Sequence, residues 1–216
     1  MLFKDRVDAG QQLAARLQHL AGPDLVILGL PRGGVPVAAE VARALGAPLD
    51  IIVVRKLGAP FQPEFALGAL GEDGVRVMNP EALGYAVATP DELSATEERE
   101  RQEIVRRALR YRGGRARRAL NGRVAVIIDD GIATGSTARA ACQVARALGA
   151  ERVVLAVPVA PEGWETRIGN DADEKICVAT PPWFFAIGQF YDDFGQTSDA
   201  EVAACLDRYA GDDQDQ

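Results

Sequence analysis

The sequence predicts an α/β fold, a doubly wound and mostly parallel sheet flanked by helices, with a small hood lobe beside it. The first observation is a set of short, uninterrupted apolar runs, which suit strands that are buried on both faces. The second is that segments with helical spacing alternate with these runs, as in parallel sheets built from strand–helix–strand crossovers. The runs lie at residues 25–30, 51–54, 124–128, 153–157 and 176–179.

Glycines, prolines and capping residues indicate where the helices begin and end. Thr89-Pro90-Asp91-Glu92 combines an N-cap residue, a first-turn proline and a glutamate three residues after the cap. A long helix should therefore begin there and continue to Gly113. Residues 58–74 contain several glycines and prolines, which favours a loop or short antiparallel strands over a crossover helix. The other helices are expected near residues 4–21, 36–46, 136–149 and 201–209.

The length allows one substantial core. A chain of 216 residues with 48% hydrophobic content suits one domain with a small appended lobe. We expect a single domain over residues 1–210, with its core at about 24–158. The hood lobe would come from the N-terminal helix and residues 160–210. Residues 211–216 should form a disordered tail.

The amino-acid composition argues against some kinds of binding partner for this protein. The formal net charge is −7 and the pI about 4.9, which argues against a nucleic-acid surface. The arginines at the end of the long helix are better explained as cations near a helix C-terminus. No apolar run approaches the roughly 20 residues of a membrane span, and the N-terminus lacks a secretory pattern. We therefore expect a cytoplasmic protein without a membrane partner.

Cysteine and histidine usage excludes several chemistries. Cys142, Cys177 and Cys205 are odd in number and far apart in the sequence, which favours buried reduced thiols over a disulfide framework or a zinc site. The single histidine, His19, lies in the amphipathic N-terminal pattern. It is expected on a helix surface, which leaves Ser-His-Asp and Cys-His catalysis without support.

The third apolar run leads into the segment with the clearest chemistry. Asp129 and Asp130 follow it directly, and ligands bind at the carboxyl ends of strands in open α/β sheets. The loop at 131–137 combines hydroxyl side chains with glycines and opens a helix, so hydroxyls, backbone N–H groups and the helix dipole together make a phosphate site. Because vicinal ribose hydroxyls donate to carboxylates, the segment fits a ribose 5-phosphate.

Two other phosphate motifs do not match. A P-loop needs Gly-Lys-Ser/Thr at the loop end, and the lysine is missing. A dinucleotide fingerprint needs Gly-x-Gly-x-x-Gly after the first strand, and Gly29, Gly33 and Gly34 have the wrong spacing.

Residues 124–137, Val-Ala-Val-Ile-Ile-Asp-Asp-Gly-Ile-Ala-Thr-Gly-Ser-Thr, resemble the signature of the type I phosphoribosyltransferases. Two more segments match that family in order and type: Leu30-Pro31-Arg32-Gly33-Gly34 resembles its pyrophosphate loop, and Arg55-Lys56 resembles its basic pair. Each of these two is weak alone, because Gly-Gly turns and exposed Arg-Lys pairs are common. Together the three cover roughly residues 24–158, and the surrounding sequence looks like a bacterial subgroup with no settled acceptor.

The resemblance implies an enzyme of nucleotide metabolism that transfers the phosphoribosyl group of phosphoribosyl pyrophosphate (PRPP) to a nitrogen acceptor, such as a nucleobase, and releases pyrophosphate. Asp129, Asp130, Arg55 and Lys56 would be catalytic, with Asp130 closer to the acceptor. Mg²⁺ would be the cofactor, bound mainly through PRPP. The 5′-phosphate loop would comprise Gly131, Ala133, Thr134, Gly135, Ser136 and Thr137, and the pyrophosphate loop would comprise Pro31, Arg32, Gly33 and Gly34.

The family also has a mobile loop and a hood. Residues 57–74 are the candidate loop, although they are less basic than the orotate-type loop. Trp183 is the candidate for stacking on the acceptor, with core packing as the alternative, and residues 190–194 either complete the hood or support it. Partners would be small molecules, and a homodimer is compatible with the resemblance. The second hypothesis is a PRPP-binding regulator without turnover, and Arg55-Lys56 favours catalysis over it.

Overall fold

The computed structural model describes residues 1–59, 62–79, 82 and 89–209, with backbone only at 62–66. Its centre is a five-stranded parallel sheet in the order β2-β1-β6-β7-β8. This confirms the predicted doubly wound α/β class. The strands are β1 (Leu25–Gly29), β2 (Leu49–Ile51), β6 (Val124–Ile128), β7 (Arg152–Val159) and β8 (Glu174–Ala179). The predicted tail at 211–216 lies outside the described residues.

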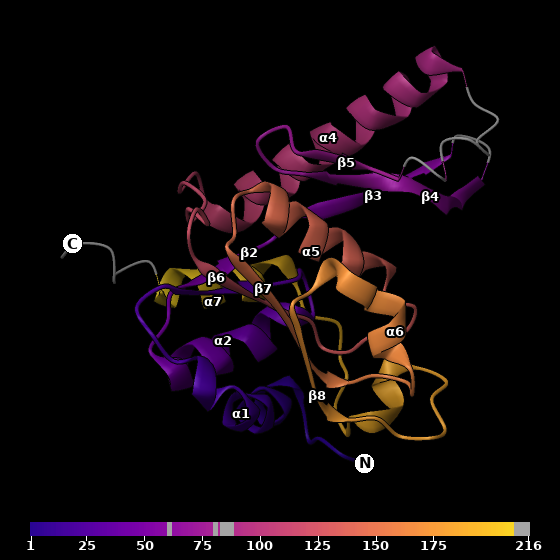
Figure 1. Cartoon of the computed structure of the whole chain (residues 1–216). Coiled ribbons are helices and arrows are strands. Elements are labelled where there is room, and N and C mark those ends of the chain that lie inside the picture. Colours follow the sequence, from indigo (N-terminus) through magenta and orange to yellow (C-terminus); the bar gives the residue numbers. More distant parts are fainter. Residues whose placement is uncertain (60–61, 80–81, 83–88, 210–216) are drawn as a thin grey trace.

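Helices cover both faces of this sheet (Figure 1). One face carries α1 (Arg6–Arg16), α2 (Gly34–Leu45) and α7 (Asp199–Arg208), and the other carries α5 (Ser136–Ala147) and the short α6 (Trp164–Ile168). The helix expected at residues 4–21 is shorter than predicted, because a 3-10 turn, η1 (Gln18–Leu20), follows α1. Two more 3-10 turns, η2 (Gly169–Asp171) and η3 (Ile187–Phe190), lie in the C-terminal third.

The alternation of side chains along the strands divides the core in two. Leu25 and Ile27 of β1 pack with α1 and α2, whereas Val26 and Leu28 pack with α5 and Trp164. Both sets are almost fully buried. This two-sided burial explains why the strands appear in the sequence as continuous apolar runs.

A second, antiparallel sheet lies above the first (Figure 1). It consists of β3 (Val54–Ala59), β4 (Gln62–Gly71) and β5 (Arg76–Met78), and it packs between α5 and the long helix α4 (Pro90–Arg112). The antiparallel strands predicted for this region are confirmed. The ends of α4 are as predicted too, with a Thr89–Glu92 capping box and left-handed Gly113 at φ 60°.

The predicted second strand, residues 51–54, is wrong at both ends. The central sheet takes Leu49–Ile51, and Val54 already begins the antiparallel sheet. Ile52 and Val53 lie between the two sheets and are buried there. Their burial produces the same apolar run that a longer strand would give.

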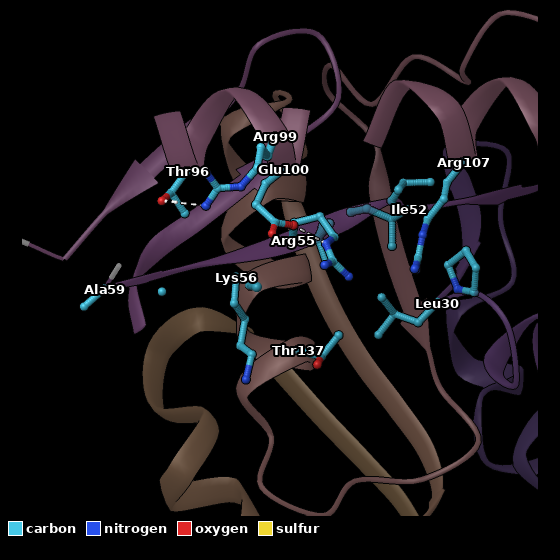
Figure 2. Close-up of a pocket in the computed structure, with 15 residues that line it drawn as sticks. Leu30, Ile52, Arg55, Lys56, Ala59, Thr96, Arg99, Glu100, Arg107 and Thr137 are labelled. Carbon is cyan, nitrogen blue, oxygen red and sulfur yellow. Dashed lines mark hydrogen bonds and ion pairs between the residues drawn. The ribbon is translucent and has the colours of Figure 1, made fainter. Parts of the chain in front are cut away.

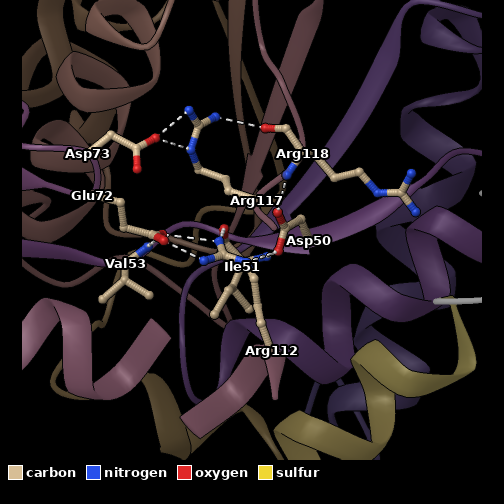
Figure 3. Close-up of polar contacts among 8 residues, drawn as sticks. All are labelled: Asp50, Ile51, Val53, Glu72, Asp73, Arg112, Arg117 and Arg118. Carbon is tan, nitrogen blue, oxygen red and sulfur yellow. Dashed lines mark hydrogen bonds and ion pairs between the residues drawn. The ribbon is translucent and has the colours of Figure 1, made fainter. Parts of the chain in front are cut away.

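A buried ionic network joins the two sheets and α4 (Figure 3). The Arg112 side chain, 5% exposed, donates to Asp50 at 2.7 Å, to the Ile51 carbonyl at 2.9 Å and to Glu72. Asp50 also accepts from the Arg118 backbone N–H at 2.8 Å. Through these contacts the end of α4 and the β4–β5 turn are held against β2. In the part of the chain that is described, no helix has the length and apolar character to cross a bilayer.

Candidate functional site

Two adjoining cavities open at the carboxyl ends of β1, β2 and β6. The first, of about 480 Å³, lies between the pyrophosphate-loop candidate, β3, α4 and the start of α5. The second, of about 560 Å³, lies between the same loop, α4 and the C-terminal segment 187–199. Pro31 and Arg107 line both cavities, so the two are parts of one larger site.

The acidic pair stands at the end of β6. Asp130 is 8% exposed and accepts a hydrogen bond from Arg6 Nε at 2.8 Å, while its backbone N–H donates to Asp129 Oδ1 at 2.9 Å. Tyr191 donates its hydroxyl to the Asp130 carbonyl at 2.6 Å. Burial raises the pKa of both carboxyls, the Asp130 charge raises the pKa of Asp129 further, and Arg6 opposes the rise at Asp130. The pair is thus poised to accept hydroxyl donors or a cation.

Gly33 and Gly34 bring the pyrophosphate-loop candidate against this pair. A Cβ at Gly33 would lie 2.0 Å from Asp130 Oδ2, and one at Gly34 would lie 2.5 Å from the Ile128 carbonyl oxygen. Neither position has room for a side chain. The Pro31–Arg32 peptide bond in this loop is cis. Two segments about a hundred residues apart in the sequence therefore meet in van der Waals contact.

The hydroxyl loop follows the acidic pair and opens α5. Gly135 has φ 82°, a left-handed conformation that favours glycine, and α5 begins at the next residue. The Thr134 and Ser136 hydroxyl oxygens lie 3.2 Å apart, and Thr137 lines the first cavity. Hydroxyls and free N–H groups at a helix N-terminus form an anion site.

Gly131 and Ala133, also predicted in this loop, have supporting contacts. A Cβ at Gly131 would lie 2.7 Å from Ile187 Cγ2, so the loop packs directly on η3. The Ala133 carbonyl accepts from Arg167 at 3.2 Å. These contacts fix the loop between the sheet and the C-terminal segment.

The predicted basic residues are divided between the cavities. Arg55 and Lys56, at the start of β3, line the first cavity, where Arg55 Nε lies 2.5 Å from Glu100 Oε2. Lys56 extends beside Thr137 there (Figure 2). Arg32 lines the second cavity and lies 3.7 Å from Asp199 Oδ1. The structure thus brings the three cations to one site, on either side of Pro31.

Comparisons with known proteins identify the family of this chain. The family model described as a phosphoribosyl transferase domain matches residues 4–194. The chain belongs to the phosphoribosyltransferase family. It is 60% identical over 207 residues to two Mycobacterium tuberculosis proteins, "Putative phosphoribosyl transferase MT0597" of strain CDC 1551 and "Putative phosphoribosyl transferase Rv0571c" of strain H37Rv. The match covers 96% of this chain and 47% of each relative, so the chain spans about half of their length.

A solved structure extends the agreement to the whole fold. The crystal structure of TT1426 from Thermus thermophilus is 47% identical and superposes with a TM-score of 0.89. The match covers 98% of this chain and 100% of that one. The chain therefore shares its fold with this solved structure over nearly all of its length.

Sequence reasoning missed the contribution of α4 to the candidate site. Arg106, Arg107 and Arg110 line the second cavity, and Arg99 and Arg107 line the first. In Figure 2, Arg107 reaches from α4 toward Leu30. A signal was present in the sequence, since Arg99, Arg106 and Arg110 are seven and four residues apart and therefore share one helix face, and Arg107 is three residues before Arg110.

The aromatic candidates of the hood separate into three groups. Trp183 is 75% exposed and lines neither cavity, so it is not a core residue. Phe190 and Tyr191 are buried scaffold residues. Phe194 lines the second cavity, where the Arg6 guanidinium carbon lies 4.1 Å from the centre of its ring. The run at 190–194 therefore both supports the hood and reaches the site.

Proposed function

We propose that this protein transfers the phosphoribosyl group of PRPP to a nitrogen acceptor, such as a nucleobase, with release of pyrophosphate. The observation that carries the proposal is the contact between residues 33–34 and the acidic pair, which the hydroxyl loop follows directly in the chain. A sugar bearing a phosphate at one end and a diphosphate at the other needs these three sites side by side.

PRPP binding would use each site for one part of the molecule. The 5′-phosphate would lie at residues 134–137, at the N-terminus of α5. Asp129 and Asp130 would accept hydrogen bonds from the ribose diol. The diphosphate would lie along residues 31–34, with Arg32, Arg55 and Lys56 around it.

The residues of this site could hold Mg²⁺ only together with phosphates of the substrate. Among the described residues no three His, Cys, Asp or Glu side chains gather into a metal cage. Asp129 and Asp130 still offer carboxylate oxygens, and Mg²⁺ is commonly held by one or two carboxylates together with substrate phosphates. When bound, the ion would neutralise charge on the departing diphosphate.

Transfer requires stabilisation of opposite charges on the two sides of C1. The acceptor nitrogen forms a bond to C1 as the C1–O bond breaks, and the bonding electrons leave with the diphosphate. Arg32, Arg55 and Lys56 stabilise that anion, and the carboxylates of Asp129 and Asp130 stabilise the positive charge that develops on the ribose. The proton lost by the acceptor passes to Asp130 or to water.

Protection from water would come from the region at 57–74. Because water could attack the activated sugar, a cover over the site is expected. In the structure this region contains the end of β3, all of β4 and the start of the turn that leads to β5, and residues 60–61 within it lie outside the described part. We propose that the antiparallel sheet serves as that cover.

A test of turnover separates an enzyme from a regulator that binds PRPP without reaction. Purines, pyrimidines and small amines would be screened with Mg²⁺ and PRPP for pyrophosphate release, and PRPP affinity would be measured by calorimetry. Release that depends on one acceptor and is lost in Asp129→Asn with Asp130→Asn supports the transferase. Tight PRPP binding without release for any acceptor would favour the regulator.

A further inference from the structure

The second cavity concentrates positive charge in an acidic protein. It is lined by five arginines and two carboxylates, whereas the whole chain has a formal net charge of −7. Three arginines come from two neighbouring turns of α4, one comes from α1 and one comes from the pyrophosphate-loop candidate. The arginines are Arg106, Arg107, Arg110, Arg6 and Arg32.

The contacts within the cavity leave this charge only partly neutralised. Asp199 is shared by Arg110, at 2.6 Å, and Arg32, at 3.7 Å. Glu103 is likewise shared by Arg106, at 2.8 Å, and Arg107, at 2.6 Å. Each of these carboxylates thus faces two guanidinium groups, and an additional anion would be attracted to the cavity.

The proposed binding of PRPP does not use all of these cations. Its 5′-phosphate would lie at residues 134–137, and its diphosphate would lie near Pro31, where the two cavities meet. Arg106 and Arg110 line the second cavity only. They line the part of the site that Asp130 and the C-terminal segment also line, and that none of residues 134–137 lines. The acceptor would lie in this part.

The lining of the same cavity includes two apolar residues, although Arg6 and the Tyr191 ring already pack on the ring of one of them, Phe194. Phe194 and Ile187 line it beside Asp130, and Arg6 already stacks on the Phe194 ring at 4.1 Å. A ring placed there would contact apolar side chains at one end and the arginines of α4 at the other. The combination selects a flat molecule with an acidic group.

We infer that the acceptor is a planar nitrogen compound bearing a carboxylate or phosphate, with its acidic group against Arg106 and Arg110. This inference rests on the proposed transfer and specifies its substrate class. The diphosphate of PRPP is a second anion that these arginines could bind, and the test below separates the two sources.

Matched pairs of ring compounds provide the test. Orotate with uracil, nicotinate with nicotinamide, and anthranilate with aniline differ chiefly by a carboxylate. Binding of each compound and of Mg²⁺–PRPP would be measured by calorimetry on the full chain, and pyrophosphate release would be measured in parallel. The variant is Arg106→Gln with Arg110→Gln. The control, Arg146→Gln with Arg152→Gln, removes the same charge from two arginines that pair instead with Asp173 and Glu174.

We expect at least one carboxylated compound to bind more than tenfold more tightly than its neutral partner. The α4 variant should lose that preference while PRPP affinity stays within twofold, and the control should match the wild type. Equal binding within every pair, or no binding of any acid, would overturn the inference. A loss of PRPP affinity as large as the loss for the acid would assign the arginines to the diphosphate. A further outcome is that an acid binds only when Arg106 and Arg110 are present but no pyrophosphate is released. That result would refute the proposed transfer and would still support an anion-binding site at these arginines.

Discussion

Asp129 shows how a residue suited to ligand binding can reduce stability. Its pKa is raised well above the ordinary value by burial and by the neighbouring Asp130 charge. Between the ordinary pKa of about 3.9 and the raised one, the folded protein binds more protons than the unfolded chain, so stability falls as pH rises. An uncharged isostere should remove this penalty.

We therefore predict that Asp129→Asn increases the free energy of unfolding at pH 8 and that the gain shrinks toward pH 4. Urea denaturation at several pH values measures this gain in stability. The asparagine oxygen can still accept from the Asp130 N–H, so the local hydrogen bond is kept. A variant less stable than the wild type at pH 8 would show that the Asp129 charge is stabilised in the free protein.

Gly33 offers a second test at this scale. In Gly33→Ala the new methyl group would lie 2.0 Å from Asp130 Oδ2 and 3.2 Å from Arg6 Nε. The carboxylate must move, so we predict at least a tenfold loss of Mg²⁺–PRPP affinity by calorimetry, about 1.4 kcal/mol. Gly22→Ala is the control, because its nearest atom would be 3.9 Å away. Unchanged affinity in a folded Gly33→Ala protein would separate this loop from the ligand.

At the scale of elements, the Arg112 network fixes α4 and the antiparallel sheet on the core. Arg112→Met keeps the apolar stem but leaves Asp50 and Glu72 buried without their cation. Breaking a buried pair in this way costs roughly 3 to 5 kcal/mol. Arg115→Met is the control, since its pair with Asp207 is exposed and is worth at most about 1 kcal/mol. Chemical denaturation of both variants measures the difference in their free energies of unfolding. Equal losses of stability would show that the Arg112 network does not hold α4 and the antiparallel sheet on the core.

The elements also show what sequence patterns can and cannot predict. The ends of α4 were predictable because Thr89, Glu92 and Gly113 act locally, through hydrogen bonds and backbone conformation. The ends of the strand expected at residues 51–54 were not predictable. An apolar run indicates only that residues are buried, and Ile52 and Val53 are buried without belonging to a strand. Local rules thus locate helix ends better than they locate strand pairing.

Part of the candidate site could likewise be predicted from the sequence, and part could not. The acidic pair with its hydroxyl loop follows β6 and the pyrophosphate-loop candidate follows β1, so the parallel sheet brings these segments to one edge. Arg55 and Lys56 instead lie in β3 of the antiparallel sheet. The arginines of α4 come from a helix whose orientation is set by distant contacts such as Arg112 with Asp50. Their spacing indicated a shared face, but only the packed structure shows that this face lines the cavities.

The topology of the whole molecule explains where the site lies. From β1 the chain proceeds to β2 on one side of the sheet, and β6 pairs with β1 on the other side. This change of direction creates a crevice between the carboxyl ends of β1 and β6, the usual ligand position in such sheets. The glycines of the pyrophosphate-loop candidate and the acidic pair meet there. Contacts with PRPP would therefore come from segments between residue 31 and residue 137.

Because these segments belong to both sheets, PRPP should stabilise the molecule as a unit. At a free concentration one hundred times the Kd, binding adds about 2.7 kcal/mol, which for a protein of this size corresponds to a rise in Tm of roughly 5 to 10 °C. Ribose 5-phosphate at the same concentration should give a smaller rise in Tm, since it lacks the diphosphate.

In the variant Arg55→Gln with Lys56→Gln, the rise in Tm with PRPP should fall toward the rise with ribose 5-phosphate, because both side chains line the cavity assigned to the leaving group. Thermal denaturation with each ligand measures this, and an equal reduction for the two ligands would assign Arg55 and Lys56 to general attraction of anions.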